Sequence, residues 1–214
     1  MYVFAGVALL ALALWLVRRL RSKARHEVDD CAAHTPAAGE TPPKDPDLIY
    51  VAPFPPGGDF TLDSASGAVS LQDFRGKVVL LFFGYTYCPD VCPMSLVTLS
   101  QTLKLLTEAD RSRVKGIFIS VDPQRDNVQR LEQYTSYFGS DVVGVTGSPE
   151  QIAAVADLYG AQYYRVDLPG SAMGYAIDHS AAIYLIDPKG KLRLLFRHTA
   201  NPERIAESIR KLLK

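Results

Sequence analysis

Two cysteines separated by three residues, Cys88 and Cys92, are the residues of this chain best suited to chemistry. They follow an apolar run from Val78 to Phe83 and precede leucines at a helical spacing. A helix amino terminus carries partial positive charge, which stabilises a thiolate and lowers the pKa of a nearby cysteine. Such a pair could close a disulfide, or both thiolates could bind one soft metal ion.

The proline that follows the pair bears on its position. Because proline lacks the amide hydrogen that a helix interior needs, we expect Pro93 to be the first helical residue. Cys92 would then lie at the helix cap and Cys88 in the loop before it. We therefore expect the pair to lie on a turn with some freedom.

A spacing of three residues, where disulfide oxidoreductases typically have two, favours a metal role. Two thiolates are too few for a zinc site, which normally has four ligands, whereas copper(I) is a soft ion that thiolates select and that accepts two or three ligands. A third ligand is therefore needed. Of the four histidines, His179 is the candidate, since it precedes an apolar strand from Ala181. In a thioredoxin-type fold, the loop before that strand faces the cysteine turn.

The elements that must position these residues alternate along the chain. After a hairpin at 60–70 we expect strands at 78–83, 114–121, 142–145, 162–166, 181–186 and 192–196, and helices at 95–109, 128–138, 149–159 and 202–213. This order predicts an α/β fold with a central mixed sheet flanked by helices. A cysteine pair between the first core strand and the first helix is the thioredoxin-like arrangement.

The first 58 residues differ in composition from the rest of the chain. An apolar run from Tyr2 to Val17 is followed by arginines and a lysine, which predicts a membrane anchor or uncleaved signal segment at 1–19. Residues 20–58 are basic and then proline-rich, which is typical of a semi-extended linker. We place the folded domain at 59–214. Cys31 and His34 fall in the linker, and we assign no role to them.

Composition narrows the classes of function. Charges balance at 23 against 23, so nucleic acid is not an expected partner. Three cysteines cannot build a disulfide framework, so stability must come from core packing.

Five motifs of this chain occur in the order of the Sco/SenC family, which the chain resembles from about Phe60 to Leu213. They are the cysteine block 83–93, the segment 120–126, Val145-Thr146-Gly147, Asp178-His179-Ser180 and Tyr184-Leu185-Ile186-Asp187-Pro188. The cysteine block together with the later Asp-His-Ser is highly specific. Asp122 and Asp178 also match, and we interpret both first as structural, with Asp178 considered as a residue that orients His179.

The resemblance implies a thioredoxin-like domain that binds copper through Cys88, Cys92 and His179. It implies a metallochaperone that acts in assembly of the CuA site of cytochrome c oxidase, with subunit II and a copper donor protein as partners. The alternative is a thiol–disulfide oxidoreductase that keeps the CuA cysteines reduced through Cys88 and Cys92. We do not expect an enzyme beyond that thiol activity. Peroxide reduction is disfavoured, because Tyr85 replaces the threonine of thioredoxin-fold peroxidases.

The predicted location conflicts with the charge pattern. Basic residues after the anchor would place the domain in the cytoplasm by the positive-inside rule. The resemblance instead implies a single-pass protein of the inner membrane with its domain on the periplasmic or exocytoplasmic side. We expect the second arrangement, with a basic segment upstream of this start or an exception to the rule.

Overall fold

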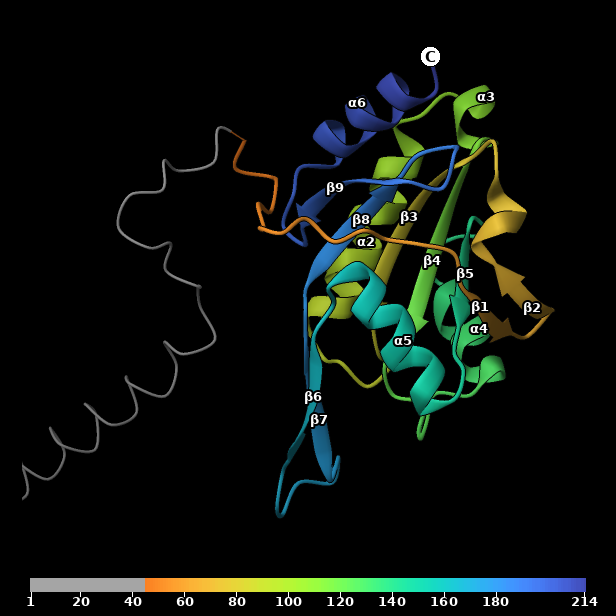
Figure 1. Cartoon of the computed structure of the whole chain (residues 1–214). Coiled ribbons are helices and arrows are strands. Elements are labelled where there is room, and N and C mark those ends of the chain that lie inside the picture. The colour runs from red at the N-terminus through yellow and green to blue at the C-terminus, as the bar shows by residue number, and fades with distance from the viewer. Residues whose placement is uncertain (1–44) are drawn as a thin grey trace, which may run out of the picture. The chain divides into compact units, whose positions relative to one another are not determined.

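A five-stranded mixed sheet forms the centre of the domain. The computed structural model describes residues 45–214, and within them the strand order is β5-β4-β3-β8-β9 (Figure 1). Strands β3, β4 and β5 pair in parallel, and β8 pairs antiparallel with both β3 and β9. The members are β3 (Val78–Gly84), β4 (Val114–Ser120), β5 (Val142–Val145), β8 (Ala182–Ile186) and β9 (Leu192–Arg197).

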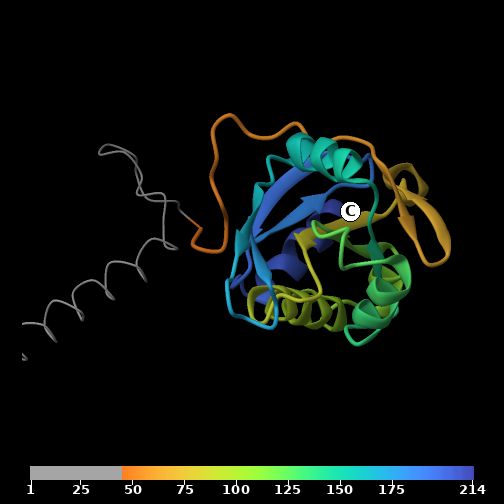
Figure 2. The same cartoon turned by 90° about the horizontal axis from the view of Figure 1, so that it is seen from below.

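Strand β3 lies in the middle of the sheet, and both of its faces are covered. Every residue of β3 is buried, as its continuous apolar sequence predicts for a central strand. Helix α5 (Pro149–Tyr159) covers one face of the sheet. Helices α2 (Val91–Lys104) and α6 (Pro202–Leu212) pack against each other on the opposite face (Figure 2).

Local capping signals explain where the better-defined helices begin and end. Ser148 and Gln151 form a capping box at the start of α5, and Gly160 ends it in the left-handed region with φ of 63°. Asn127 caps α4 (Val128–Ser136) through Arg130 N. The remaining short helices are α3 (Glu108–Arg111) and the 3-10 turn η2 (Leu71–Phe74).

Two hairpins lie outside the main sheet. Strands β1 (Thr61–Ser64) and β2 (Gly67–Ser70) form the expected first hairpin. Strands β6 (Tyr163–Asp167) and β7 (Tyr175–His179) form a separate antiparallel sheet that projects from one end of the domain (Figure 1). The sequence analysis placed His179 in a loop before the strand from Ala181. That prediction was wrong, because His179 is the last residue of β7 and pairs with Tyr163 of β6.

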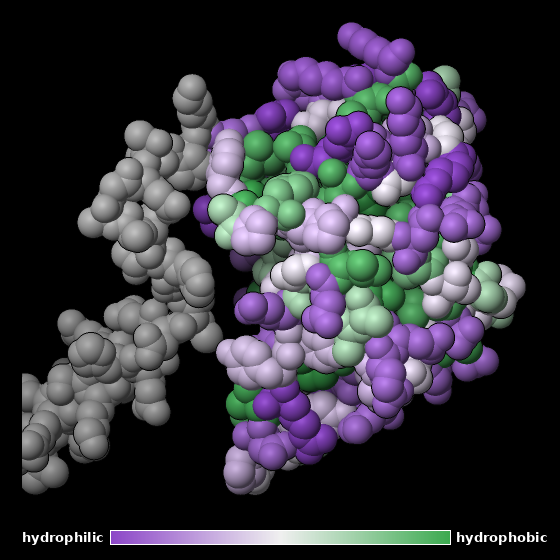
Figure 3. Space-filling model, viewed as in Figure 1, coloured by the Kyte–Doolittle hydropathy of each residue, from purple (hydrophilic) through white to green (hydrophobic). Residues whose placement is uncertain are grey.

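Helix α6 shows the amphipathic pattern expected of a surface helix. Ile205, Ala206 and Ile209 are buried against α2, while its charged residues face outward. The region around α6 at the top of Figure 3 is accordingly mostly hydrophilic, with small apolar patches between the polar side chains.

Part of the predicted linker packs on the domain. Ile49 N donates to Leu195 O at 2.8 Å, and Asp45 forms an ion pair with Arg204 at 2.7 Å. The predicted anchor, with Cys31 and His34, lies outside the described residues. No helix within residues 45–214 is both long and apolar enough to cross a membrane.

Candidate metal centre

The cysteine pair lies where β3 passes into α2. Strand β3 ends at Gly84, and the chain turns so that Cys88 N donates to Tyr85 O at 3.2 Å. The fully buried carboxylate of Asp126 fixes this loop, since it accepts from Thr86 N at 2.9 Å and from Thr86 Oγ1 at 2.5 Å. We call residues 85–90 the cysteine loop.

Helix α2 begins earlier than the sequence analysis predicted. Asp90 is the cap and Val91 the first residue, so Cys92 lies within the first turn and Pro93 is the third helical residue. The prediction that Pro93 opens the helix and Cys92 caps it was wrong. The first turn tolerates proline because its amides need no helical acceptor, and the bond from Met94 N to Asp90 O at 3.2 Å follows directly after it. Only Cys88 therefore lies on the loop, and Cys92 is held by the helix.

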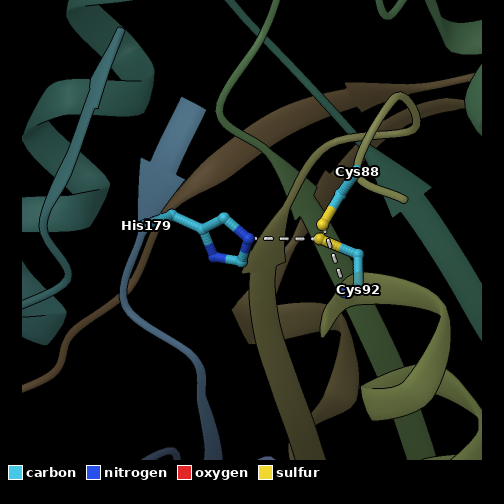
Figure 4. Close-up of side chains that lie close together, drawn as sticks. All are labelled: Cys88, Cys92 and His179. Atoms are coloured by element: carbon cyan, nitrogen blue, oxygen red, sulfur yellow. Dashed lines mark hydrogen bonds between the residues drawn. The ribbon is translucent and has the colours of Figure 1, made fainter. Parts of the chain in front are cut away.

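His179, the last residue of β7, is the third candidate ligand. Its Nε2 lies 3.2 Å from Cys92 Sγ, and Cys92 N donates to Cys88 Sγ at 3.5 Å (Figure 4). The two sulfur atoms and a ring nitrogen of His179 all lie within 4.8 Å of one another. Among residues 45–214, no other group of three or more candidate metal ligands converges in this way.

The imidazole has a defined orientation. His179 Nδ1 lies 3.2 Å from Ser180 O, and since a carbonyl only accepts, this contact places the ring proton on Nδ1. The lone pair on Nε2 then faces the thiols. The rings of Phe82 and Tyr85 pack edge-on against the imidazole at 5.9 Å between centroids. Asp178, considered as the orienting residue, is exposed, and the Ser180 carbonyl takes that role.

The two thiols differ in charge. The hydrogen bond from Cys92 is the main cause that lowers the pKa of Cys88 to about 3, against an opposing effect of burial. Burial, followed by the adjacent Cys88, raises the pKa of Cys92 above its ordinary value. Cys88 is half-buried and Cys92 fully buried. The pair therefore consists of an accessible thiolate and an enclosed thiol.

Gly84 makes room for this arrangement. A β-carbon added at Gly84 would lie 2.6 Å from Cys92 Sγ and 2.8 Å from Phe118, distances at which something must shift. The sequence analysis gave no role to Gly84 or Asp126. Both stand within the motifs it quoted, and a polar residue shortly after the buried strand β4 was the signal that could have found Asp126.

The fold and this site define a thioredoxin-like domain in which two cysteines and a histidine meet at the end of the central strand. The family model described as SCO1/SenC matches residues 52–214, which is more than half of the chain. The chain belongs to the SCO1/SenC family.

Individual relatives agree with this assignment. The mouse protein SCO2 homolog, mitochondrial, is 40% identical over 156 residues, which cover 72% of this chain and 61% of the mouse protein. SenC of Rhodobacter capsulatus is 40% identical over 154 residues, 72% of this chain and 68% of SenC. The structure of Bradyrhizobium japonicum ScoI with copper bound matches with a TM-score of 0.66 at 39% identity, covering 73% of this chain and 99% of that one. The chain thus spans less than two thirds of the length of its mouse relative.

Proposed function

We propose that this chain binds copper through Cys88, Cys92 and His179. The convergence of two sulfur atoms and one imidazole nitrogen within 4.8 Å is the observation that carries the proposal. Thiolates are soft ligands that select copper(I), and imidazole suits copper as well. The proton on His179 Nδ1 is held by a carbonyl, which leaves Nε2 ready to coordinate without rearrangement of the ring.

The exposure of the ligands suggests how the cargo ion would be transferred. Cys92 is fully buried, while Cys88 and His179 are partly exposed. A thiolate of a partner protein can therefore approach beside Cys88 and His179 and enter the coordination of the ion. Those two ligands would leave first, and Cys92 last.

The recipient in this proposal is the CuA site of cytochrome c oxidase subunit II, and a copper donor protein loads the chain. Membership of the SCO1/SenC family supports this role, as does the copper-bound state of the similar ScoI. The chain would act as a metallochaperone, which delivers its ion by ligand exchange and performs no net chemical conversion.

Copper uptake by the reduced full chain tests the proposal. We expect one copper(I) per chain, and a much weaker affinity in His179→Ala, Cys88→Ser and Cys92→Ser. His198→Ala is the matched control, because His198 lies outside the site near the start of α6 and should bind as wild type does. An unchanged affinity in His179→Ala would remove His179 from the site.

A second candidate function is thiol–disulfide exchange, which the thiolate state of Cys88 favours. Cys88 would attack one sulfur of a partner disulfide, and Cys92 would resolve the mixed disulfide. The partner then leaves with two thiols, this chain keeps a Cys88–Cys92 disulfide, and a dithiol reductant must restore it. His179→Ala separates the two functions, since it should impair copper binding and leave disulfide reduction intact.

The location is also part of the proposal. Residues 1–19 would anchor the chain in the inner membrane, the part of the linker before Asp45 would act as a tether, and the domain would lie on the periplasmic side. Topology reporters fused after Lys214 test this arrangement. A reporter active in the periplasm is expected, and one active only in the cytoplasm would overturn it.

A further inference from the structure

One short segment after β4 contacts both halves of the site. Residues 122–126 connect β4 to α4, and we call them the 122–126 segment. Asp126 faces the cysteine loop, where it accepts from Thr86, and Ser120 Oγ donates to it at 2.7 Å. Arg125 and Asp122 face the other way, toward the β6–β7 hairpin that carries His179.

Arg125 contacts β7 through hydrogen bonds and through its guanidinium face. Its Nη1 donates to Tyr175 O at 2.9 Å and to Met173 O at 3.3 Å. Its Cζ lies 3.5 Å from the centroid of the Tyr175 ring, the distance of a close cation–π contact. The start of β7 is thus bound by two main-chain acceptors and one aromatic face.

Asp122 binds both Arg125 and Tyr175. This carboxylate is 2% exposed, forms an ion pair with Arg125 Nε and accepts from Tyr175 OH at 2.8 Å. A buried ion pair is specific in geometry, because each charge would be costly without its partner. Asp122, Arg125 and Tyr175 therefore form a closed triangle.

The opposite side of Arg125 contacts the cysteine loop. Its Cζ lies 4.7 Å from the ring of Tyr87 and 5.7 Å from the ring of Tyr85. Tyr85 in turn packs against the imidazole of His179. One guanidinium group is thus enclosed between the strand that bears the histidine and the loop that bears Cys88.

The Arg125 contact differs in position from the other attachments of the hairpin. Strands β6 and β7 form their own sheet and do not join the ladder of the five-stranded sheet. Hydrogen bonds between Gln162 and Ser180 join the two strands at the base of the hairpin, next to His179. Near that base, Ile177 is buried in the core and Tyr85 packs against His179. The Arg125 contact at Tyr175 lies at the other end of β7, where it keeps the strand from tilting away from the cysteine loop.

We propose that Arg125 is a positioning residue, which holds β7 against the cysteine loop so that His179 Nε2 stays within reach of Cys92 Sγ. Its effect on copper rests on the proposed function, whereas its effect on the hairpin does not. Loss of residues that orient metal ligands typically weakens metal binding 10- to 100-fold. We expect a loss in that range when the Arg125 contact is removed.

Two variants remove the contact in different ways. Arg125→Met deletes the guanidinium but leaves Asp122 buried without its partner, which also destabilises the fold. Tyr175→Leu deletes the aromatic face and keeps the ion pair. Arg165→Met is the matched control, because Arg165 stacks on the same Tyr175 ring at 3.8 Å and pairs with Asp167, both within the hairpin.

Amide hydrogen exchange of the metal-free full chain tests the attachment. We expect faster exchange across residues 163–179 in Arg125→Met and Tyr175→Leu. Exchange in β3 and β4 should be unchanged in Tyr175→Leu and less accelerated than the hairpin in Arg125→Met, and Arg165→Met should exchange like wild type. Exchange as slow as wild type in both variants would overturn the proposal. Equal acceleration in the central sheet would also overturn it, since Arg125 would then only support the fold as a whole.

Pulsed electron paramagnetic resonance of the copper(II)-loaded chain tests the positioning. The imidazole nitrogen coupling that His179→Ala abolishes should weaken in both variants and persist in Arg165→Met. An unchanged coupling despite a loosened hairpin would refute the positioning role. If the wild-type chain took up no copper, the proposed function would fail, and the exchange measurement would still decide whether Arg125 attaches the hairpin.

Discussion

Replacing Gly84 by alanine tests whether the space beside Cys92 is as restricted as the geometry indicates. The added methyl group would lie 2.6 Å from Cys92 Sγ, about 0.8 Å inside the 3.4 Å at which ordinary contact begins. Phe118 at 2.8 Å blocks the other side. Since the sulfur belongs to a buried residue in the first turn of α2, it can move away only if the helix start moves with it.

Overpacking of this kind costs about 1–3 kcal/mol. For a domain of this size, about 2 kcal/mol corresponds to a fall in Tm of roughly 4–8 °C. We expect this fall in the metal-free chain by calorimetry. In the same variant, competition with a copper(I) chelator should show a weaker affinity, because the Cys92 sulfur no longer faces His179.

Gly116→Ala is the matched control for this prediction. Gly116 lies in the neighbouring strand β4, and a β-carbon there would lie 3.1 Å from methyl groups of Leu99 and Val142, a less severe contact than at Gly84. We expect some loss of stability and an unchanged copper affinity. A Gly84→Ala chain with wild-type Tm and wild-type affinity would refute the reasoning, and so would equal affinity losses in the two variants.

Three further predictions concern ionisation and buried hydrogen bonds. Because Cys88 has a pKa of about 3 while Cys92 is buried, iodoacetamide should label Cys88 and spare Cys92 in the native reduced chain at pH 6, as read by mass spectrometry; equal labelling of these two would contradict the assignment. Asp126→Ala should lower the free energy of unfolding by about 2–5 kcal/mol in urea titrations, since it leaves several donors, Thr86 N among them, without an acceptor. Burial raises the pKa of Asp187, but hydrogen bonds from Lys191 and Arg193 outweigh it and hold this pKa below 3.8. The ionised carboxylate therefore stabilises the fold fully above pH 3.8, and this stabilisation is lost as the pH falls through the lowered pKa. Asp187→Asn should therefore flatten the acid limb of the stability curve between pH 5 and 2, and an unchanged limb would contradict this.

The sequence predicted the elements whose signals are local and apolar. The bounds 142–145 and 149–159 agree with β5 and α5, because an apolar strand and a helix with a capping box and a terminal glycine mark their own ends. The thioredoxin-like sheet followed from the order of these elements and is confirmed by the similar solved structures. The convergence of Cys88, Cys92 and His179 followed in turn from that fold.

The elements that were missed lack such signals. Strand β7 has no apolar run, and only Ile177 in it is buried, because its hairpin projects from the domain and has little core to face. The start of α2 was misjudged because proline favours the first helical position but is tolerated throughout the first turn, and Pro93 lies third. The contacts of Arg125 join residues about 50 positions apart, which no local pattern reveals.

The wide separation of the three converging residues has a consequence for how the folded chain would respond to its ion. Cys88 and Cys92 are near neighbours in sequence and remain so in an unfolded chain, whereas His179 is 87 residues from Cys92. An unfolded chain can therefore offer the ion two sulfurs but must lose conformational entropy over that long loop to offer the nitrogen. A ligand stabilises the folded state only by the excess of its affinity for that state. Loss of His179 should then remove more of the thermal stabilisation by the ion than expected for one of three equal ligands. Coordination by the imidazole requires that the polypeptide between Cys92 and His179 has folded.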